Sequence, residues 1–247
     1  MRHCLLLVLA LVTGLVLTGC NGPSPEAKTV TVYADAAASD ALRAGARVFR
    51  QTRTVTEVRV QPGGSNDVVD RLTGGAQGDA LVVPETGMKR AQRAGLISGG
   101  VWTVARDGLV LVVAKGNPLD ITGLDSIAED VGLALCDDAD PCASEARELA
   151  DDADVRLMPE SRGKDALAVR DMVATGKEDV GITYASVAAT HPDGIDVIPL
   201  PGAERVVRVQ AALLADSRSP GPAEDFVKFL ASPQGQAALR ERGFTAP

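Results

Sequence analysis

Apolar residues follow two periods along most of this chain. Where they run together or fill alternate positions they predict strands, and where they recur every three or four positions they predict helices. Residues 39–52, for example, place Leu42, Ala46 and Phe49 on one helical face. Strands are expected in this way at 28–34, 57–61, 79–83, 107–118, 131–136, 155–160, 179–185, 195–200 and 205–215.

Helices are expected between these strands. The helical segments are 39–52, 66–75, 87–97, 143–152 and 163–176, and two short helices end the chain. This alternation predicts the α/β fold class, with mixed and mostly parallel sheets covered by helices. In such sheets, ligands bind where strands end and the next helices begin.

The first residues have the features of an export signal. Residues 5–17 are apolar apart from a Thr-Gly pair, a run too short for a comfortable membrane span and suited to a signal-peptide core. Residues 17–20, Leu-Thr-Gly-Cys, resemble a lipobox. We therefore expect a signal peptide at 1–19 and a lipidated tether at 20–27, with lipid on Cys20 holding the protein on the extracytoplasmic face of the cell membrane. The alternative is an ordinary signal peptide with a chance cysteine.

Two further cysteines, Cys136 and Cys142, flank a short acidic turn. They could be metal ligands, a catalytic thiol with its partner, or a disulfide. An exported chain meets oxidising conditions, and Pro141 favours a turn that brings the two sulfurs together, so we expect a disulfide. A zinc site would need more soft ligands, and His191 lies in a turn sequence, where it is expected to be solvated.

Composition excludes some classes of function. The chain carries a net charge of −8 and shows no basic cluster, which argues against nucleic acid as a partner. Aromatic residues make up only 3% of the chain, so stacking platforms for bases or sugars are not expected. The sequence also lacks a Cys–His or Ser–His pair, a metal-ligand cluster and a phosphate loop, which argues against an enzyme.

Several motifs, in their order along the chain, resemble the molybdate-binding proteins of ABC importers, a branch of the type II periplasmic binding proteins. The "GITYAS" segment with its preceding helix, and the loop with the two cysteines, carry the most specific likeness. The matching segments lie at 30–42, 63–72, 88–97, 107–118, 135–150, 163–186 and 226–244.

This resemblance implies a two-lobed fold with a hinge. Lobe 1 would comprise residues 28–107 plus 206–247, and lobe 2 residues 108–205, with the anion held between them. The protein would be a monomer without cofactor that captures molybdate, and tungstate as well, and delivers it to an ABC permease and its ATPase. Its site would bind the oxyanion through oxygen atoms, with no direct ligand to the metal.

Molybdate carries no proton at neutral pH, so every protein group that contacts its oxygens must be a hydrogen-bond donor. Backbone N–H groups at helix starts and hydroxyls suit a cargo that has to be released, because a buried ion pair is costly to form and slow to break. Ser65 follows two glycines and opens a predicted helix. The resemblance makes it a ligand through its hydroxyl and N–H. Alternatively, it only caps its own helix.

Three more positions match anion contacts of the resembled family. Tyr184 would donate its phenol, and the alternative is a half-buried core tyrosine. Cys142 and Gly163 would donate hydrogen bonds through their backbone N–H groups. Such contacts do not depend on the type of side chain. The expected disulfide would then also stiffen the loop that presents Cys142. Arg162 and Lys164 beside Gly163 could steer anions, although solvated charges at a helix start are the simpler interpretation.

The first motif departs from the resembled pattern. The position of its ligand serine falls on Ala37, and Ser39 falls two residues later. Either Ala37 supplies only its N–H, or Ser39 substitutes. Asp35 replaces an alanine, and its carboxylate would oppose an anion unless it points away. Alternatives therefore remain at this stage: a binding protein for another oxyanion or a small organic acid, an extracytoplasmic enzyme, or a sensor partner without transport.

Overall fold

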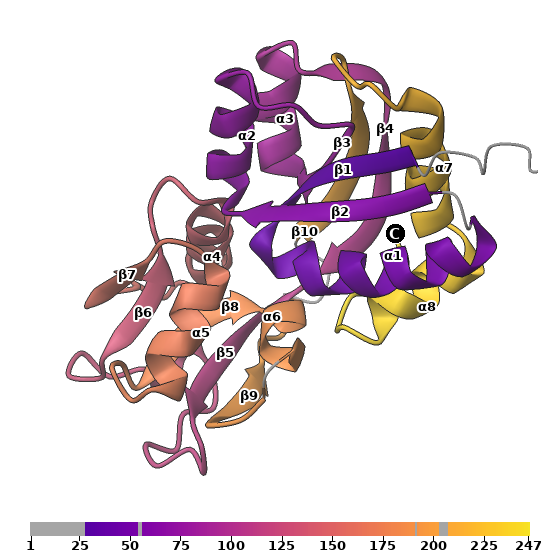
Figure 1. Ribbon diagram of the computed structural model, residues 1–247. Coiled ribbons are helices and arrows are strands. Elements are labelled where there is room, and N and C mark those ends of the chain that lie inside the picture. The colour runs from indigo at the N-terminus through magenta and orange to yellow at the C-terminus, as the bar shows by residue number, and fades with distance from the viewer. Residues whose placement is uncertain (1–27, 54–55, 191, 203–206) are drawn as a thin grey trace, which may run out of the picture.

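The structure is a computed structural model that describes residues 28–53, 56–190, 192–202 and 207–247. The expected signal peptide, Cys20 with its tether, and His191 lie outside the described residues. Figure 1 shows two parts, each built around one sheet with helices on its faces. We call them lobe 1, which contains the first and last segments of the chain, and lobe 2, which contains the middle.

Lobe 1 is built around a five-stranded sheet in the order β2-β1-β3-β10-β4. Its strands are β1 (Lys28–Asp35), β2 (Thr56–Gly63), β3 (Ala80–Pro84), β4 (Ile97–Asp107) and β10 (Val207–Leu214). Its helices are the 3-10 turn η1 (Ala36–Ala38), α1 (Ser39–Thr52), α2 (Ser65–Thr73), α3 (Glu85–Arg93), α7 (Pro220–Leu230) and α8 (Pro233–Arg240).

Lobe 2 repeats the plan with the order β7-β6-β8-β5-β9. Its strands are β5 (Leu109–Ala114), β6 (Leu133–Cys136), β7 (Ser161–Gly163), β8 (Val180–Tyr184) and β9 (Ile195–Pro199). Its helices are η2 (Leu124–Ser126), α4 (Pro141–Asp152), α5 (Ala166–Ala174) and α6 (Ala185–Thr190).

Within each described sheet, one strand runs against the other four. The exceptions are β10, antiparallel to β3 and β4, and β5, antiparallel to β8 and β9. Each is the first strand after the chain crosses from one lobe to the other. The α/β class with mixed, mostly parallel sheets is therefore confirmed, and the carboxyl ends of the parallel strands meet at one edge of each sheet.

Two segments differ from the sequence-based expectation. Residues 155–160 form no strand, and the strand of that region is β7, which begins at Ser161. The long strand β4 was not expected, because Gly99 and Gly100 and several exposed positions break its apolar pattern. It forms because β10 pairs with it along nearly its whole length, so tertiary pairing overrides local propensity.

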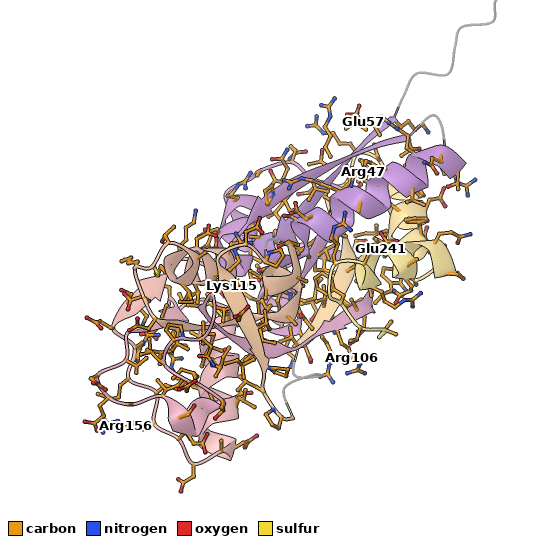
Figure 2. All side chains as sticks on the ribbon, turned by 90° about the horizontal axis from the view of Figure 1, so that it is seen from below. Arg47, Glu57, Arg106, Lys115, Arg156 and Glu241 are labelled. Atoms are coloured by element: carbon orange, nitrogen blue, oxygen red, sulfur yellow. A yellow bond between two sulfur atoms is a disulfide. The ribbon has the colours of Figure 1, made fainter. Side chains whose placement is uncertain are left out.

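The core lies on both faces of each sheet, as alternation along buried strands requires. In lobe 1, Val30 and Val32 pack with Phe49 and Phe226 on one face, while Tyr33 belongs to the cluster on the other. In lobe 2, odd and even residues of β5 divide in the same way. Charged side chains surround both lobes, as the labelled residues of Figure 2 illustrate, from Glu57 at one end to Arg156 at the other.

The two lobes are in contact. Ala37, from η1 of lobe 1, belongs to the same buried cluster as Leu109 and Tyr184 of lobe 2. The crossing from β4 to β5 is tied to lobe 2 by Asp107, whose carboxylate accepts hydrogen bonds from Gly108 N at 2.9 Å and from Ser186 Oγ at 2.5 Å. This contact brings the strand ends of both sheets face to face.

Candidate functional site

The lobe 1 side of the candidate site begins where β1 ends. Asp35 is buried and caps η1: its Oδ1 accepts the backbone N–H of Ala37 at 2.9 Å. Its other oxygen, Oδ2, accepts the hydroxyl of Ser65 at 2.5 Å. One internal carboxylate thus occupies two of the donors that the sequence predicted for an anion, and Asp35 does not point away.

Ser65 lies at the end of β2, where two glycines let the chain turn into α2. Its exposed fraction is 0%, and the N-cap of α2 is Gly64, with no side-chain capping hydrogen bond. The interpretation of Ser65 as a helix cap is therefore wrong, because its hydroxyl is turned toward Asp35. The N-terminus of α2 leaves backbone N–H groups directed at the same region.

Ser39 is placed differently from Ala37. It is the first residue of α1, whose N-cap is Ala38. Ser39 lines an outer cavity of about 440 Å³ between the lobes, together with Arg43, Lys164 and Asp165. Ala37 lines an inner cavity beside Asp35. Of the two residues proposed for the first motif, Ala37 shares the carboxylate of Asp35 with Ser65.

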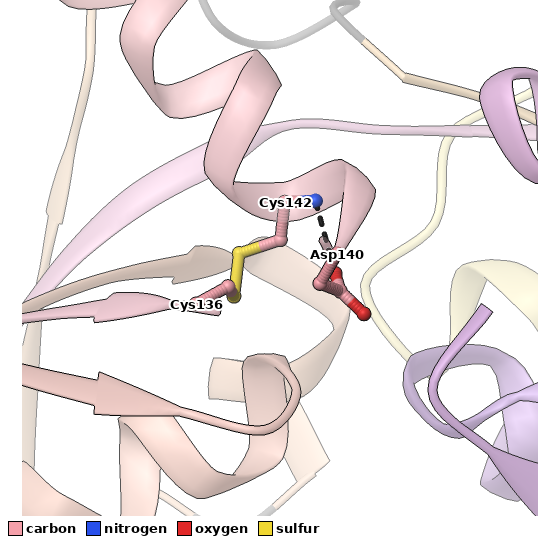
Figure 3. A group of neighbouring side chains, drawn as sticks. All are labelled: Cys136, Asp140 and Cys142. Atoms are coloured by element: carbon pink, nitrogen blue, oxygen red, sulfur yellow. Dashed lines mark hydrogen bonds between the residues drawn. A yellow bond between two sulfur atoms is a disulfide. The ribbon is translucent and has the colours of Figure 1, made fainter. Parts of the chain in front are cut away.

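On the lobe 2 side, Cys136 and Cys142 are joined by a disulfide, shown in Figure 3. Pro141 occupies the first turn of α4, where its missing N–H costs nothing. The N-cap is Asp140, whose Oδ1 accepts the N–H of Cys142 at 3.0 Å. These three features fix the start of α4, and the Cys142 donor is held by an internal carboxylate. The sulfurs are not free thiolates, so the cluster of Cys136, Asp140 and Cys142 is not a metal site.

Tyr184 ends β8 and is only 2% exposed. Its phenol donates a hydrogen bond of 2.7 Å to Oε2 of Glu145, which projects from α4. The ring packs in the core of lobe 2 and is more buried than the half-buried core tyrosine of the alternative interpretation. Tyr184 also lines the inner cavity with Asp35 and Ala37. The phenol of Tyr184 is thus a fourth donor that an internal carboxylate occupies.

Gly163 ends β7 and lies in register with Cys136 on β6. A Cβ at this position would lie 2.9 Å from the backbone nitrogen of Val169, so only glycine fits here without displacing α5. Arg162 next to it donates to the carbonyl of Cys136 at 3.0 Å and pairs with Asp138. Its charge is therefore engaged within lobe 2 and does not face the cleft as a free cation.

The lobes approach closely around these groups. A side chain at Gly64 would lie 3.4 Å from Oδ2 of Asp140 and 3.6 Å from the carbonyl oxygen of Lys164. The amide of Asn66 donates to the carbonyl of Ala139 across the interface. The inner cavity has a volume of about 10 Å³, room for about one water molecule. Two of the residues that line this cavity, Asp35 and Asp107, are acids.

Burial makes these acids unusual. It raises the pKa of Asp140 to about 7 and that of Glu145 to about 8, since desolvation disfavours their charged forms and the charge of Asp35 adds to the effect. The pKa of Asp107 is raised to about 7 for the same main reason. The pKa of Asp35 is also raised by burial, against the opposing effect of its hydrogen bonds.

Sequence reasoning missed Asp140, Glu145 and Asp107 as parts of this site. One signal was available: an aspartate directly before a proline at a helix start is a strong capping pattern. No sequence signal marks Glu145, since its role follows from which face of α4 turns toward Tyr184. Four of the anion contacts predicted from the sequence lie where the strands of the two sheets end and face each other. They are Ser65, Ala37, Cys142 and Tyr184.

Comparison with known families places the chain. Residues 30–245 match the family described as bacterial extracellular solute-binding protein. The chain belongs to this family. A molybdate-binding protein, ModA, of Mycobacterium tuberculosis is 30% identical over 247 residues, which cover 96% of this chain and 95% of that protein.

Solved structures share the fold. The sulfate-binding protein SubI of Mycobacterium tuberculosis has a TM-score of 0.76 at 18% identity, covering 89% of this chain and 87% of that one. The periplasmic molybdate-binding protein of Azotobacter vinelandii has a TM-score of 0.73 at 16% identity, covering 88% and 99%. Separately, the described part of the chain contains no helix long and apolar enough to cross a membrane.

Proposed function

We propose that this solute-binding protein captures molybdate, and tungstate equally well, between its two lobes and delivers it to an ABC permease with its ATPase. One observation supports this function most. Uncharged donors predicted from the sequence come from both lobes and meet at facing strand ends: Ala37 N and Ser65 Oγ from one side, Cys142 N and Tyr184 Oη from the other.

The chemistry of these donors suits a tetrahedral dianion without a proton. The starts of α2 and α4 add partial positive charge from the helix dipole without a formal counter-ion. Gly163 N would complete the lobe 2 side. A mycobacterial relative that matches nearly the whole chain is itself a molybdate-binding protein, which supports the same cargo here.

The two lobes would act as hinged halves. In this proposal lobe 1 comprises residues 28–107 plus 206–247 and lobe 2 residues 108–205. One crossing is the segment around Gly108, and the other includes residues outside the described part. A ligand drives closure only through contacts that are better made in the closed form, and donors on both lobes provide such contacts.

We further propose that lipid on Cys20 tethers the protein to the outer face of the cell membrane and that it acts as a monomer. Its task is binding and delivery, without catalysis and without a cofactor. Tethering keeps the binding protein close to the permease. Labelling with a radioactive fatty acid in cells would test the anchor, and a Cys20→Ser variant should lose both the label and the membrane fraction.

The direct test is thermal unfolding with molybdate, tungstate, sulfate and phosphate. A ligand present at 100 times its Kd stabilises the folded form by about 2.7 kcal/mol. We expect a clear rise in melting temperature with molybdate and tungstate only. No shift with any of the four anions would contradict an oxyanion cargo, and turnover of a substrate would support an enzyme instead.

Two substitutions test the site itself. We expect Ser65→Ala and Tyr184→Phe each to weaken molybdate binding by roughly 1–3 kcal/mol, measured by calorimetry, since each removes a donor. Tyr33→Phe is a matched control, because Tyr33 lies in the core of lobe 1 beneath Arg71, away from the cleft. Unchanged affinity in both site variants would contradict this assignment.

A second candidate is a binding protein for an oxyanion that carries its own proton, such as hydrogen phosphate. The observation that favours it is the set of internal carboxylates, because Asp35, Asp140 and Glu145 can accept a hydrogen bond from such an ion and not from molybdate. Stabilisation by phosphate alone in the same melting experiment would favour this candidate.

A further inference from the structure

Four hydrogen-bond donors at the interlobe site, those of Ala37, Ser65, Cys142 and Tyr184, are each engaged by a carboxylate of the chain itself. Asp35 accepts from two of them, the N–H of Ala37 at 2.9 Å and the hydroxyl of Ser65 at 2.5 Å. Both contacts lie within lobe 1, so they form whether or not the lobes close. An anion entering from the cleft meets its lobe 1 donors occupied.

The inner cavity beside Asp35, as the described residues line it, is too small for an anion. The inner cavity lined by Asp35, Ala37 and Tyr184 holds about one water molecule, and a tetrahedral ion of five heavy atoms needs several times that volume. Either the carboxylate leaves its partners or the lobes stay apart. The carboxylate of Asp35 thus accepts the hydrogen bonds that an anion oxygen would accept.

The charges around Asp35 also oppose the binding of an anion. The titratable groups whose charges couple to Asp35 or to its neighbouring acids are themselves acids or a phenol: Asp107 at the end of β4, Asp140 at the N-cap of α4, Glu145 on α4, Asp165 at the N-cap of α5 and Tyr184 at the end of β8. The cations Arg43 and Lys164 line the outer cavity, and no cation is among the described residues that line the inner one. A dianion would be repelled at short range by each of these acids that is ionised, and more of them ionise as the pH rises through 7 to 8.

We propose that Asp35 is an affinity-determining residue that competes with the oxyanion for the donors of Ala37 and Ser65, and that binding of one dianion is accompanied by uptake of one proton from solvent at Asp35. The neutral carboxyl releases the hydroxyl of Ser65 and can itself donate to an anion oxygen. This inference rests on the proposed function of oxyanion capture. Burial of Asp35 supports it, because desolvation already raises the pKa of this group.

Calorimetric titration with sodium molybdate between pH 6 and 8.5 tests the proposal. We expect wild-type affinity to fall with rising pH, by up to about tenfold per pH unit for one linked proton. Asp35→Ala should bind at least about tenfold more tightly than wild type at pH 8, and its binding should take up one proton fewer. Repeating the titration in buffers of different ionisation enthalpy counts the protons directly.

Two further variants keep the result interpretable. Asp35→Asn retains the shape of the side chain and should also lose one linked proton, which covers the case that the alanine variant folds poorly. Asp67→Asn is the matched control: Asp67 is exposed on α2, two residues after Ser65, and its charge acts on Asp140, but the four donors of the site bond to other acids. It removes a nearby charge and should change affinity by less than about threefold.

The outcomes separate the two levels of inference. If Asp35→Ala and wild type bind molybdate with equal affinity and equal proton uptake, Asp35 does not compete and the proposal is overturned. If Asp35→Ala loses binding of phosphate that wild type shows, Asp35 is an acceptor for a protonated ligand, which also overturns it. If no variant binds any of the four anions at any pH, the proposed function itself fails.

Discussion

The two halves of the interlobe site hold their donors in different ways. In lobe 1, Ala37 and Ser65 share the single carboxylate of Asp35. In lobe 2, the Cys142 N–H and the Tyr184 phenol each have their own acid, Asp140 and Glu145, and both acids belong to α4.

The halves also differ in what fixes their backbone. The disulfide between Cys136 and Cys142 links the start of α4 to β6. Pro141 in the first turn and the N-cap Asp140 also fix where the helix begins. The turn after β1 has only the Asp35 cap of η1. In lobe 2 the backbone that carries the donors is therefore held by a disulfide. In lobe 1 it is held by Asp35, the same residue that occupies the donors. Preorganisation of this kind reduces the ordering cost of binding.

The largest effect that would test this comparison is the pH dependence of stability through Glu145. Its pKa is about 8 in the folded protein and near the ordinary 4.5 when unfolded, because burial beside Tyr184 and the charge of Asp35 disfavour ionisation. The folded state thus binds the extra proton, and stability is full below pH 4.5 and falls as pH rises toward 8. We expect Glu145→Gln to be more stable than wild type above pH 8, on the order of 3 kcal/mol.

Urea unfolding at pH 5, 6.5 and 8.5 measures this difference. Glu148→Gln is the matched control, because Glu148 lies on the same helix one turn later and is exposed. Equal pH slopes for wild type and Glu145→Gln would show that the Glu145 carboxyl is not held neutral by burial.

A smaller effect is expected from the disulfide. Replacing both Cys136 and Cys142 by alanine should lower the free energy of unfolding by on the order of 1–3 kcal/mol, since the closed loop is short. This loss of stability should be confined to the neighbourhood of the disulfide. Amide hydrogen exchange should become faster at the start of α4 and stay unchanged at the start of α2 in lobe 1. Equal acceleration at both helices would show that the brace acts on the whole protein and not on one half of the site.

The smallest effect concerns the first motif. Ser39→Ala should change molybdate affinity by about twofold or less, because the Ser39 hydroxyl lines the outer cavity while Ala37 lies beside Asp35. Calorimetry alongside Ser65→Ala gives the comparison. A loss with Ser39→Ala as large as that with Ser65→Ala would move the lobe 1 contact to Ser39.

Much of the architecture was readable in the pattern of apolar positions. The helix predicted at 39–52 is α1 over the same residues, β1 is one residue longer than predicted, and β8 is one residue shorter at each end. The strand β4 was missed because its exposed glycines carry no apolar period, and only its partner β10 makes it a strand. Pairing between distant segments is not encoded in local periodicity.

The sequence by itself determined the α/β plan, the hydroxyl, phenol and loop residues that could face an anion, and the presence of a carboxylate at Asp35. Only the tertiary structure decided where that carboxylate points and that Asp140 and Glu145 join it. Local patterns report which face of an element is apolar, but the acids meet because two separate sheets turn their strand ends toward each other. That convergence depends on the packing of the two lobes, which no single segment contains.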